Sequence, residues 1–160
     1  MRQRTPELAP EDAKVLDDVE QYGVHIVHVA EDEDGDRPCF SFTVGLWETY
    51  QQAEVIVFGL PMEVAAELLD GLTDEADADR RFRAGEKHDG LLVGYPVRFL
   101  ELPKERCGEL LDVATWAYEG DGFDAVQLVW PDKQGRWPWE DGVREGFAAS
   151  QPIIGRRAAP

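Results

Sequence analysis

Histidine is the side chain whose ordinary pKa suits proton transfer near neutral pH, and this chain has three: His25, His28 and His88. Residues 24–29 predict a strand, in which alternate side chains face opposite sides, so His25 and His28 point apart. Glu54 opens the next strongly apolar run. If the protein is an enzyme, His28 and Glu54 are the candidates for its general acid and base.

A nucleophile beside a histidine is conceivable across a hairpin. Cys39 or Ser41 would face His25 or His28, because facing residues on paired strands have Cβ atoms about 5 Å apart. No G-x-S-x-G motif supports such a centre, and neither Gly-rich nucleotide-binding motif occurs. Two diverging histidines, together with cysteines that lack ligand spacing, predict no metal site.

Polar residues interrupt an otherwise apolar strand at Ser41, Thr43 and Gly45, and Gln127 is placed to join them from another strand. Buried polar groups must find partners, which are other protein atoms or a small ligand. In small split barrels, similar hydroxyls and backbone amides grip the phosphate of flavin. A flavin-like or other anionic cofactor is therefore one alternative, although the cofactor itself is not identified by any residue.

Aromatic residues gather near the C-terminal end, where Trp130, Trp137 and Trp139 enclose Arg136. They predict either a binding hot spot or an aromatic lid on the sheet, with Arg136 stacked over a ring. Trp47 is expected to belong to the same cluster. The candidate ligand-binding residues are Ser41, Thr43, Gly45, Trp47, Gln127, Trp130, Arg136 and Trp139.

Hydrophobic periodicity and Gly and Pro positions define the expected elements. Helices are expected from Pro10 to Gly23, from Pro61 through Leu72 and from Pro103 to Gly120. Strands are expected at 24–29, 38–46, 54–60, 81–83, 91–93, 95–102 and 123–130, whereas residues after 142 show little periodicity. This pattern predicts an α+β fold with about three helices on a mostly antiparallel sheet, open or barrel-like. Residues 1–9 are a loose arm, 10–155 a single domain and 156–160 a tail.

Five ordered motifs carry a family resemblance: GVHIVHV at 23–29, FSFTVGL at 40–46, EVIVFGLP at 54–61, GYPVRF at 94–99 and QLVWPD at 127–132. Together they resemble the bacterial family known as domain of unknown function 4262, from about residue 20 to about residue 153. Phe42 replaces an expected Tyr, and Ala53 an expected Pro. The resemblance implies no activity or cofactor, because the family has none to transfer.

The net charge of the chain limits the classes of partner that it can bind. The chain has 16 Lys and Arg against 33 Asp and Glu, a net charge of −17, which repels nucleic acid and anionic membranes. The acidic runs at 31–34, 74–79 and 119–124 are interpreted as solvated loops or helix ends. No apolar leader or membrane-length run occurs, and the two cysteines lie far apart in the sequence. A cytoplasmic location is therefore expected.

Three functions remain open. The first is a small domain that binds a small molecule or a protein in a cleft lined by Thr43, Gly45, Trp47, Gln127 and Trp130. The second is an enzyme with a flavin-like or other anionic cofactor. The third is an acidic, immunity-like module that binds a basic protein by electrostatic steering. The oligomeric state is not specified by the sequence.

Overall fold

The computed structural model describes residues 1–156. Within them the chain forms six helices and six strands. The helices are α1 (Pro10–Tyr22), α2 (Leu46–Tyr50), α3 (Met62–Asp77), α4 (Lys104–Leu110), α5 (Asp112–Tyr118) and α6 (Glu145–Ser150). The strands are β1 (His25–Val29), β2 (Phe40–Val44), β3 (Glu54–Phe58), β4 (Lys87–Leu92), β5 (Tyr95–Glu101) and β6 (Ala125–Val129).

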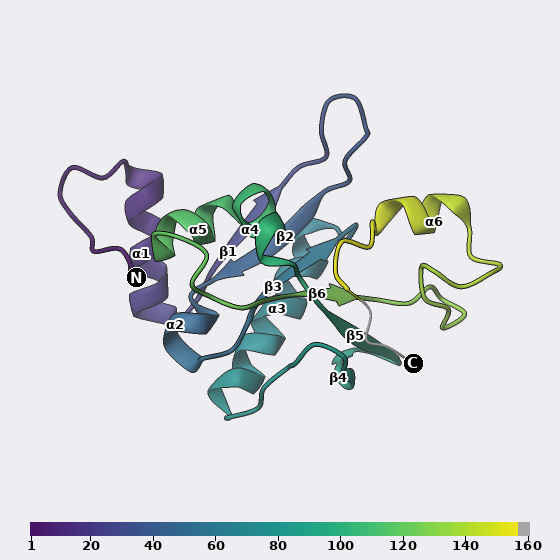
Figure 1. Cartoon of the computed structure of the whole chain (residues 1–160). Helices are drawn as coiled ribbons and strands as arrows, with labels where there is room; N and C mark the ends of the chain where they lie inside the picture. The colour runs from purple at the N-terminus through teal and green to yellow at the C-terminus, as the bar shows by residue number, and fades with distance from the viewer. Residues whose placement is uncertain (157–160) are drawn as a thin grey trace.

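All six strands form one sheet in the order β1-β2-β3-β6-β5-β4 (Figure 1). Every neighbouring pair is antiparallel except β3 and β6, which run parallel at the centre. The α+β prediction is confirmed. The barrel-like alternative is wrong, because β1 and β4 are the two open edges of the sheet and do not pair with each other.

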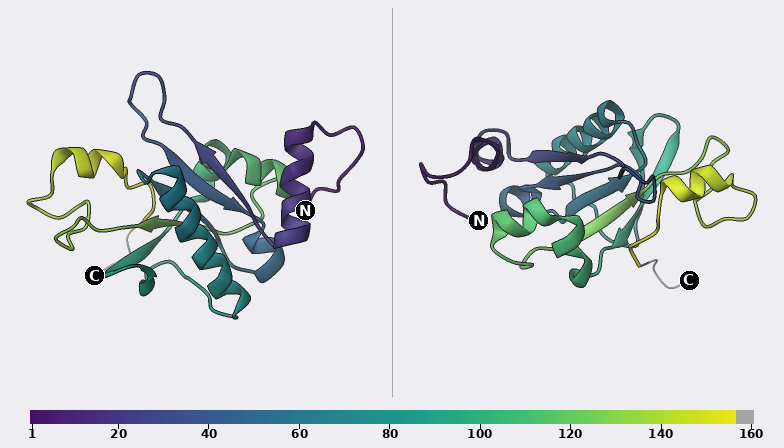
Figure 2. Two further views of the ribbon diagram at one scale, coloured as in Figure 1. Left: turned by 180° about the vertical axis from the view of Figure 1, so that it is seen from behind. Right: turned by 90° about the horizontal axis from the view of Figure 1, so that it is seen from above.

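Helices cover both faces of this sheet (Figure 2). On β3, side chains alternate: Val55 and Val57 pack toward α3, whereas Ile56 and Phe58 pack toward α1, α4 and α5. All four are at most 1% exposed. A strand that is apolar on both faces must be shielded from water on both faces. Helices shield β3 on each side, so the sheet does not have to close into a barrel.

The structure differs from the expected elements in five places, and the first is β4, which begins at Lys87 and not at the expected residue 91. The short helix α2 was not expected, and the helix predicted from Pro103 is broken at Leu111 into α4 and α5. Residues 81–83 are not a strand, and α6 lies in the segment with little periodicity. These are short elements, whose conformation is set by tertiary contacts more than by their own propensity.

Both ends of the described chain contact the body of the fold. The backbone N–H of Arg2 donates to the Ala117 carbonyl at 2.6 Å, and its guanidinium lies 4.8 Å from the Trp116 ring centre. At the other end, Arg156 pairs with Glu101 on β5. The remainder of the expected tail, 157–160, lies outside the described residues.

Candidate interaction surface

Glu54, the expected base, is completely buried at the start of β3. Its carboxylate accepts hydrogen bonds from the Thr43 hydroxyl at 2.8 Å, from the Tyr118 hydroxyl, and from the backbone N–H groups of Gly45, Leu46 and Trp47 at 2.9 to 3.2 Å. Burial raises the pKa of this carboxyl, and these donors oppose the rise. The donors occupy both oxygens, so Glu54 holds the N-terminal turn of α2 in place and leaves no oxygen open to a substrate.

The neighbours of Glu54 are fixed by the same network. Thr43 also accepts a hydrogen bond from the Val55 N–H at 2.9 Å. Gly45 adopts φ +113°, and a Cβ there would lie 2.8 Å from Val19, so a side chain would be both strained and crowded. Thr43 and Gly45 therefore do lie together, as the sequence suggested, but their partners are protein atoms.

His28 and Ser41 do face each other across the β1–β2 hairpin, with 2.7 Å between Nδ1 and Oγ. Ser41 is only 3% exposed, and burial lowers the pKa of His28 below its ordinary value. Ser41 in turn pairs with Val57, three residues beyond Glu54 on the next strand. β2 therefore lies between His28 and β3, and the β3 residue in line with His28 is three positions away from Glu54. This geometry does not support an acid–base pair.

Gln127 is fully buried in β6 and binds the C-terminal segment. Its amide donates to the Pro152 carbonyl at 2.8 Å and accepts from the N–H groups of Ile154 and Gly155 at 2.9 and 2.8 Å. Gly155 lies so close to β5 that a Cβ would approach the Leu100 Cβ to 2.6 Å. Of the two kinds of partner that the sequence left open for Gln127, protein atoms and a small ligand, residues 152–155 provide the first.

The tryptophan cluster divides into two places. Trp130 donates to the Phe58 carbonyl at 2.9 Å, whereas Trp137 and Trp139 stack 5.9 Å apart. The guanidinium that lies over Trp137, at 5.0 Å, is that of Arg98. Trp47 packs with the α1, α4 and α5 side of the core, so its expected place in this cluster was wrong.

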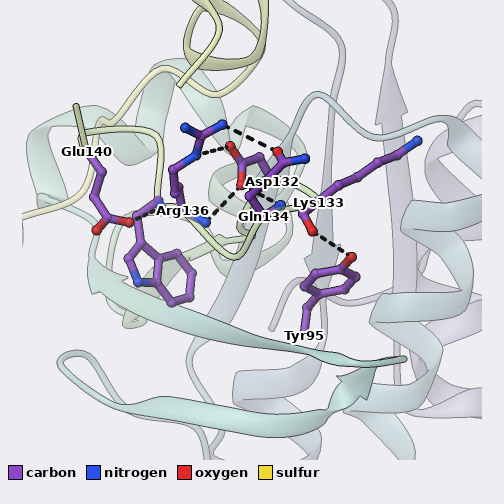
Figure 3. Close-up of polar contacts among 7 residues, drawn as sticks. Tyr95, Asp132, Lys133, Gln134, Arg136 and Glu140 are labelled. Carbon is purple, nitrogen blue, oxygen red and sulfur yellow. Dashed lines mark hydrogen bonds and ion pairs between the residues drawn. The ribbon is translucent and has the colours of Figure 1, made fainter. Parts of the chain in front are cut away.

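Arg136 does not stack on a tryptophan as the lid hypothesis required. Asp132 instead accepts hydrogen bonds from the Arg136 backbone at 2.8 Å, its Nε at 3.0 Å and the Gln134 N–H at 2.9 Å (Figure 3). Burial alone would raise the pKa of Asp132, but these donors lower it. Tyr95 fastens the same loop by donating to the Lys133 carbonyl at 3.0 Å. The polar groups of this loop therefore bond mainly to one another and to Tyr95.

Sequence reasoning missed the most distinctive surface, which is one face of α3. We call it the acidic face, and it consists of Glu63, Glu67, Asp70, Asp74 and Asp77. All five are exposed and, at about 100° per residue, lie within roughly 80° of arc, opposite the buried leucines of the helix. The helix contains no Lys, Arg or His. The signal was present in the sequence, because the acids recur with helical spacing.

A groove of about 620 Å³ adjoins the acidic face, between α3, α1 and the start of β1. Asp70 and Asp74 form one wall. On the other wall, Asp18 accepts from Lys14 Nζ at 2.7 Å and contacts His25 Nδ1 at 2.8 Å. Burial and the charge of Asp74 raise the pKa of Asp70, so these carboxylates destabilise each other in their charged forms.

Exposed apolar side chains flank this surface. Tyr22 is 62% exposed and lines the groove, while Met62 at 58% and Val64 at 39% lie on either side of Glu63. Within residues 1–156 these are three of the five large apolar side chains that are exposed. The acidic face therefore combines charge with accessible apolar area.

Within residues 1–156, no group of three or more His, Cys, Asp or Glu side chains is arranged to hold a metal ion. No helix there has the length and apolar character needed to cross a membrane.

Comparison with known proteins gives one family match. The model of the family described as domain of unknown function (DUF4262) matches residues 18–144, and the chain belongs to that family. No curated protein and no solved structure is detectably similar to it.

Proposed function

We propose that this member of the DUF4262 family is a protein-interaction module that binds a basic segment of a partner protein on the acidic face of α3 and in the adjoining groove. The observation that carries the proposal is the set of five exposed carboxylates on one face of a helix without a basic residue. Lys and Arg side chains of a partner would supply the missing countercharge, and the net charge of −17 would steer the encounter.

The arrangement also has a cost that a partner would remove. Like charges at i,i+4 destabilise a helix by about 0.2–0.5 kcal/mol per pair, and similar repulsion acts at i,i+3. Glu63–Glu67 and Asp70–Asp74 are i,i+4 pairs, and Glu67–Asp70 and Asp74–Asp77 are i,i+3 pairs. A basic segment would convert this repulsion into attraction, while Tyr22, Met62 and Val64 would contribute apolar contacts of the kind found in interface cores.

The same charges disfavour nucleic acid and anionic membranes as partners, because phosphate groups would meet carboxylates. We also propose a cytoplasmic location. Cys39 and Cys107 are both free thiols, and a reducing compartment keeps thiols in that form.

The test is the binding of a fluorescein-labelled decalysine peptide, followed by fluorescence anisotropy at low ionic strength. The surface variant combines Glu67→Gln, Asp70→Asn and Asp74→Asn. The matched control combines Glu33→Gln, Asp34→Asn and Asp36→Asn, three exposed acids of the β1–β2 loop whose removal changes the net charge equally.

Each exposed ion pair is worth a factor of about two to three, so three lost pairs weaken binding about tenfold. We expect this loss in the surface variant, little change in the control variant and weaker binding of wild type as salt is added. Equal weakening in both variants would mean that decalysine responds to net charge alone, and the proposed surface would then be wrong. Circular dichroism verifies that both variants are folded.

A further inference from the structure

A second cavity, of about 390 Å³, lies away from the acidic face, between α2, residues 81–84 and the start of α4. None of the residues of the acidic face lines it. Its volume falls within the range of small-molecule sites, which is about 300–1,000 Å³.

The cavity has an apolar wall. Phe82, Phe123 and Leu102 line it and are at most 3% exposed, whereas the ring of Trp47 is only partly buried. Trp47 is thus the aromatic surface that a ligand in this cavity could cover. Flat apolar molecules stack well on such a ring.

Two buried polar side chains hold the aromatic residues of this wall in place. The Trp47 backbone N–H donates to Glu54 at 3.2 Å. The amide of Gln52, which is 1% exposed, accepts from the Phe82 N–H at 2.7 Å and donates to the Phe82 carbonyl at 3.0 Å. The backbone that carries these two rings is therefore fixed before a ligand binds, which reduces the conformational entropy lost on binding.

Three basic residues line the cavity, and two of them are committed to protein atoms. Lys104 Nζ donates to the carbonyls of Asp121 and Phe123 at 2.9 and 2.5 Å. Arg81 Nη1 donates to the carbonyls of Ala76 and Arg80 at 3.1 and 2.9 Å.

The third basic residue is Arg83, which is exposed. No hydrogen bond or ion pair joins its guanidinium to any of residues 1–156. The carboxylates that line the cavity are Glu101 and Asp124, and Asp124 lies 3.5 Å from Lys104. Arg81 lies 3.5 Å from Asp79 as well, so among the described residues Arg83 is the one basic residue of the cavity without a carboxylate partner.

We infer that this cavity is a binding site for a small aromatic monoanion, such as an aromatic carboxylate. The ring of the ligand covers Trp47 against the apolar wall, and its carboxylate pairs with the Arg83 guanidinium, which presents N–H donors in the geometry that carboxylates accept. This site is independent of the proposed docking of a basic protein on α3.

The experiment compares two probes of nearly the same shape, 1-naphthoate and the neutral 1-naphthamide, by NMR titration of the ¹⁵N-labelled full chain. We expect 1-naphthoate to shift the Trp47 indole resonance and the amides of 82–84, and to bind about fivefold more tightly than 1-naphthamide. That preference corresponds to one partly exposed ion pair.

Arg83→Gln should abolish the preference for 1-naphthoate and leave 1-naphthamide binding unchanged. Lys87→Gln is the matched control, since it removes one exposed positive charge outside the cavity, and it should retain the preference. The inference is overturned if neither probe shifts these resonances at millimolar concentration. Equal affinity of the two probes, or an equal effect of Arg83→Gln and Lys87→Gln, overturns it as well.

Discussion

Replacing one carboxylate in the middle of the acidic face should make the protein more stable and its proposed binding weaker. Glu67 lies four residues after Glu63 and three before Asp70, so Glu67→Lys converts two repulsive pairs into two attractive ones. Each pair changes from about 0.2–0.5 kcal/mol of destabilisation to about 0.2–0.5 kcal/mol of stabilisation, and the lower end of this range gives about 1 kcal/mol for the two pairs together. For a domain of this size that free energy raises Tm by about 2–4 °C.

Thermal unfolding followed by circular dichroism measures this gain, first in about 0.01 M salt and then in about 1 M salt, where the Debye length falls from about 30 Å to about 3 Å. The gain should be largely lost in high salt. Glu33→Lys, in the β1–β2 loop, makes the same change in charge without helical neighbours and is the control. If Glu33→Lys stabilises as much as Glu67→Lys, or if salt leaves the gain intact, local repulsion on α3 is not its cause. Decalysine binding to Glu67→Lys should weaken in the same samples.

Three further predictions concern two buried polar residues, Glu54 and Gln127, and the half-buried His28. Glu54→Gln should cost about 3–5 kcal/mol in urea unfolding, because an amide cannot accept from all the donors around a buried carboxylate; a loss below about 1 kcal/mol would contradict this role. Burial lowers the pKa of His28 in the fold, so the unfolded chain takes up a proton first as pH falls below about 6.5. Wild type should therefore lose stability relative to His28→Gln between pH 7 and pH 5, and a pH-independent difference would exclude this linkage. Gln127→Leu should speed hydrogen exchange at Ile154 and Gly155, measured by mass spectrometry, with β1 unchanged as the internal reference; unchanged exchange would show that other contacts hold the segment.

Periodicity was sufficient for the long elements. The apolar stripe and Gly23 predicted α1, which runs from Pro10 to Tyr22 with Gly23 in the left-handed conformation at its end. The continuous apolar run at 54–60 predicted a strand, and β3 lies there, buried on both faces of the sheet. Local sequence decides such elements, because their residue spacing alone determines which face is buried.

The roles of the polar residues could not be predicted in this way. Glu54 holds the first turn of α2 through backbone N–H groups and also accepts from Tyr118, which is 64 residues away in the sequence. Gln127 binds a segment that begins 25 residues later. A Glu or Gln in an apolar strand indicates that a partner exists, but only the fold identifies it. The acidic face is different, because the helical spacing of its carboxylates can be seen in the sequence. Part of it, within residues 74–79, was interpreted as a solvated run.

The parallel pairing of β3 with β6 at the centre of the sheet determines how the chain must assemble. β1, β2 and β3 can pair in order as they are synthesised, and β4 and β5 form a separate hairpin. β6 lies between these two groups and pairs with β3 on one side and β5 on the other. Until residues 125–129 arrive, the Val-rich edge of β3 has no neighbour and is open to pairing with another chain. Pairing between residues some 70 positions apart is slow to form, so we expect folding and aggregation to compete at the insertion of β6.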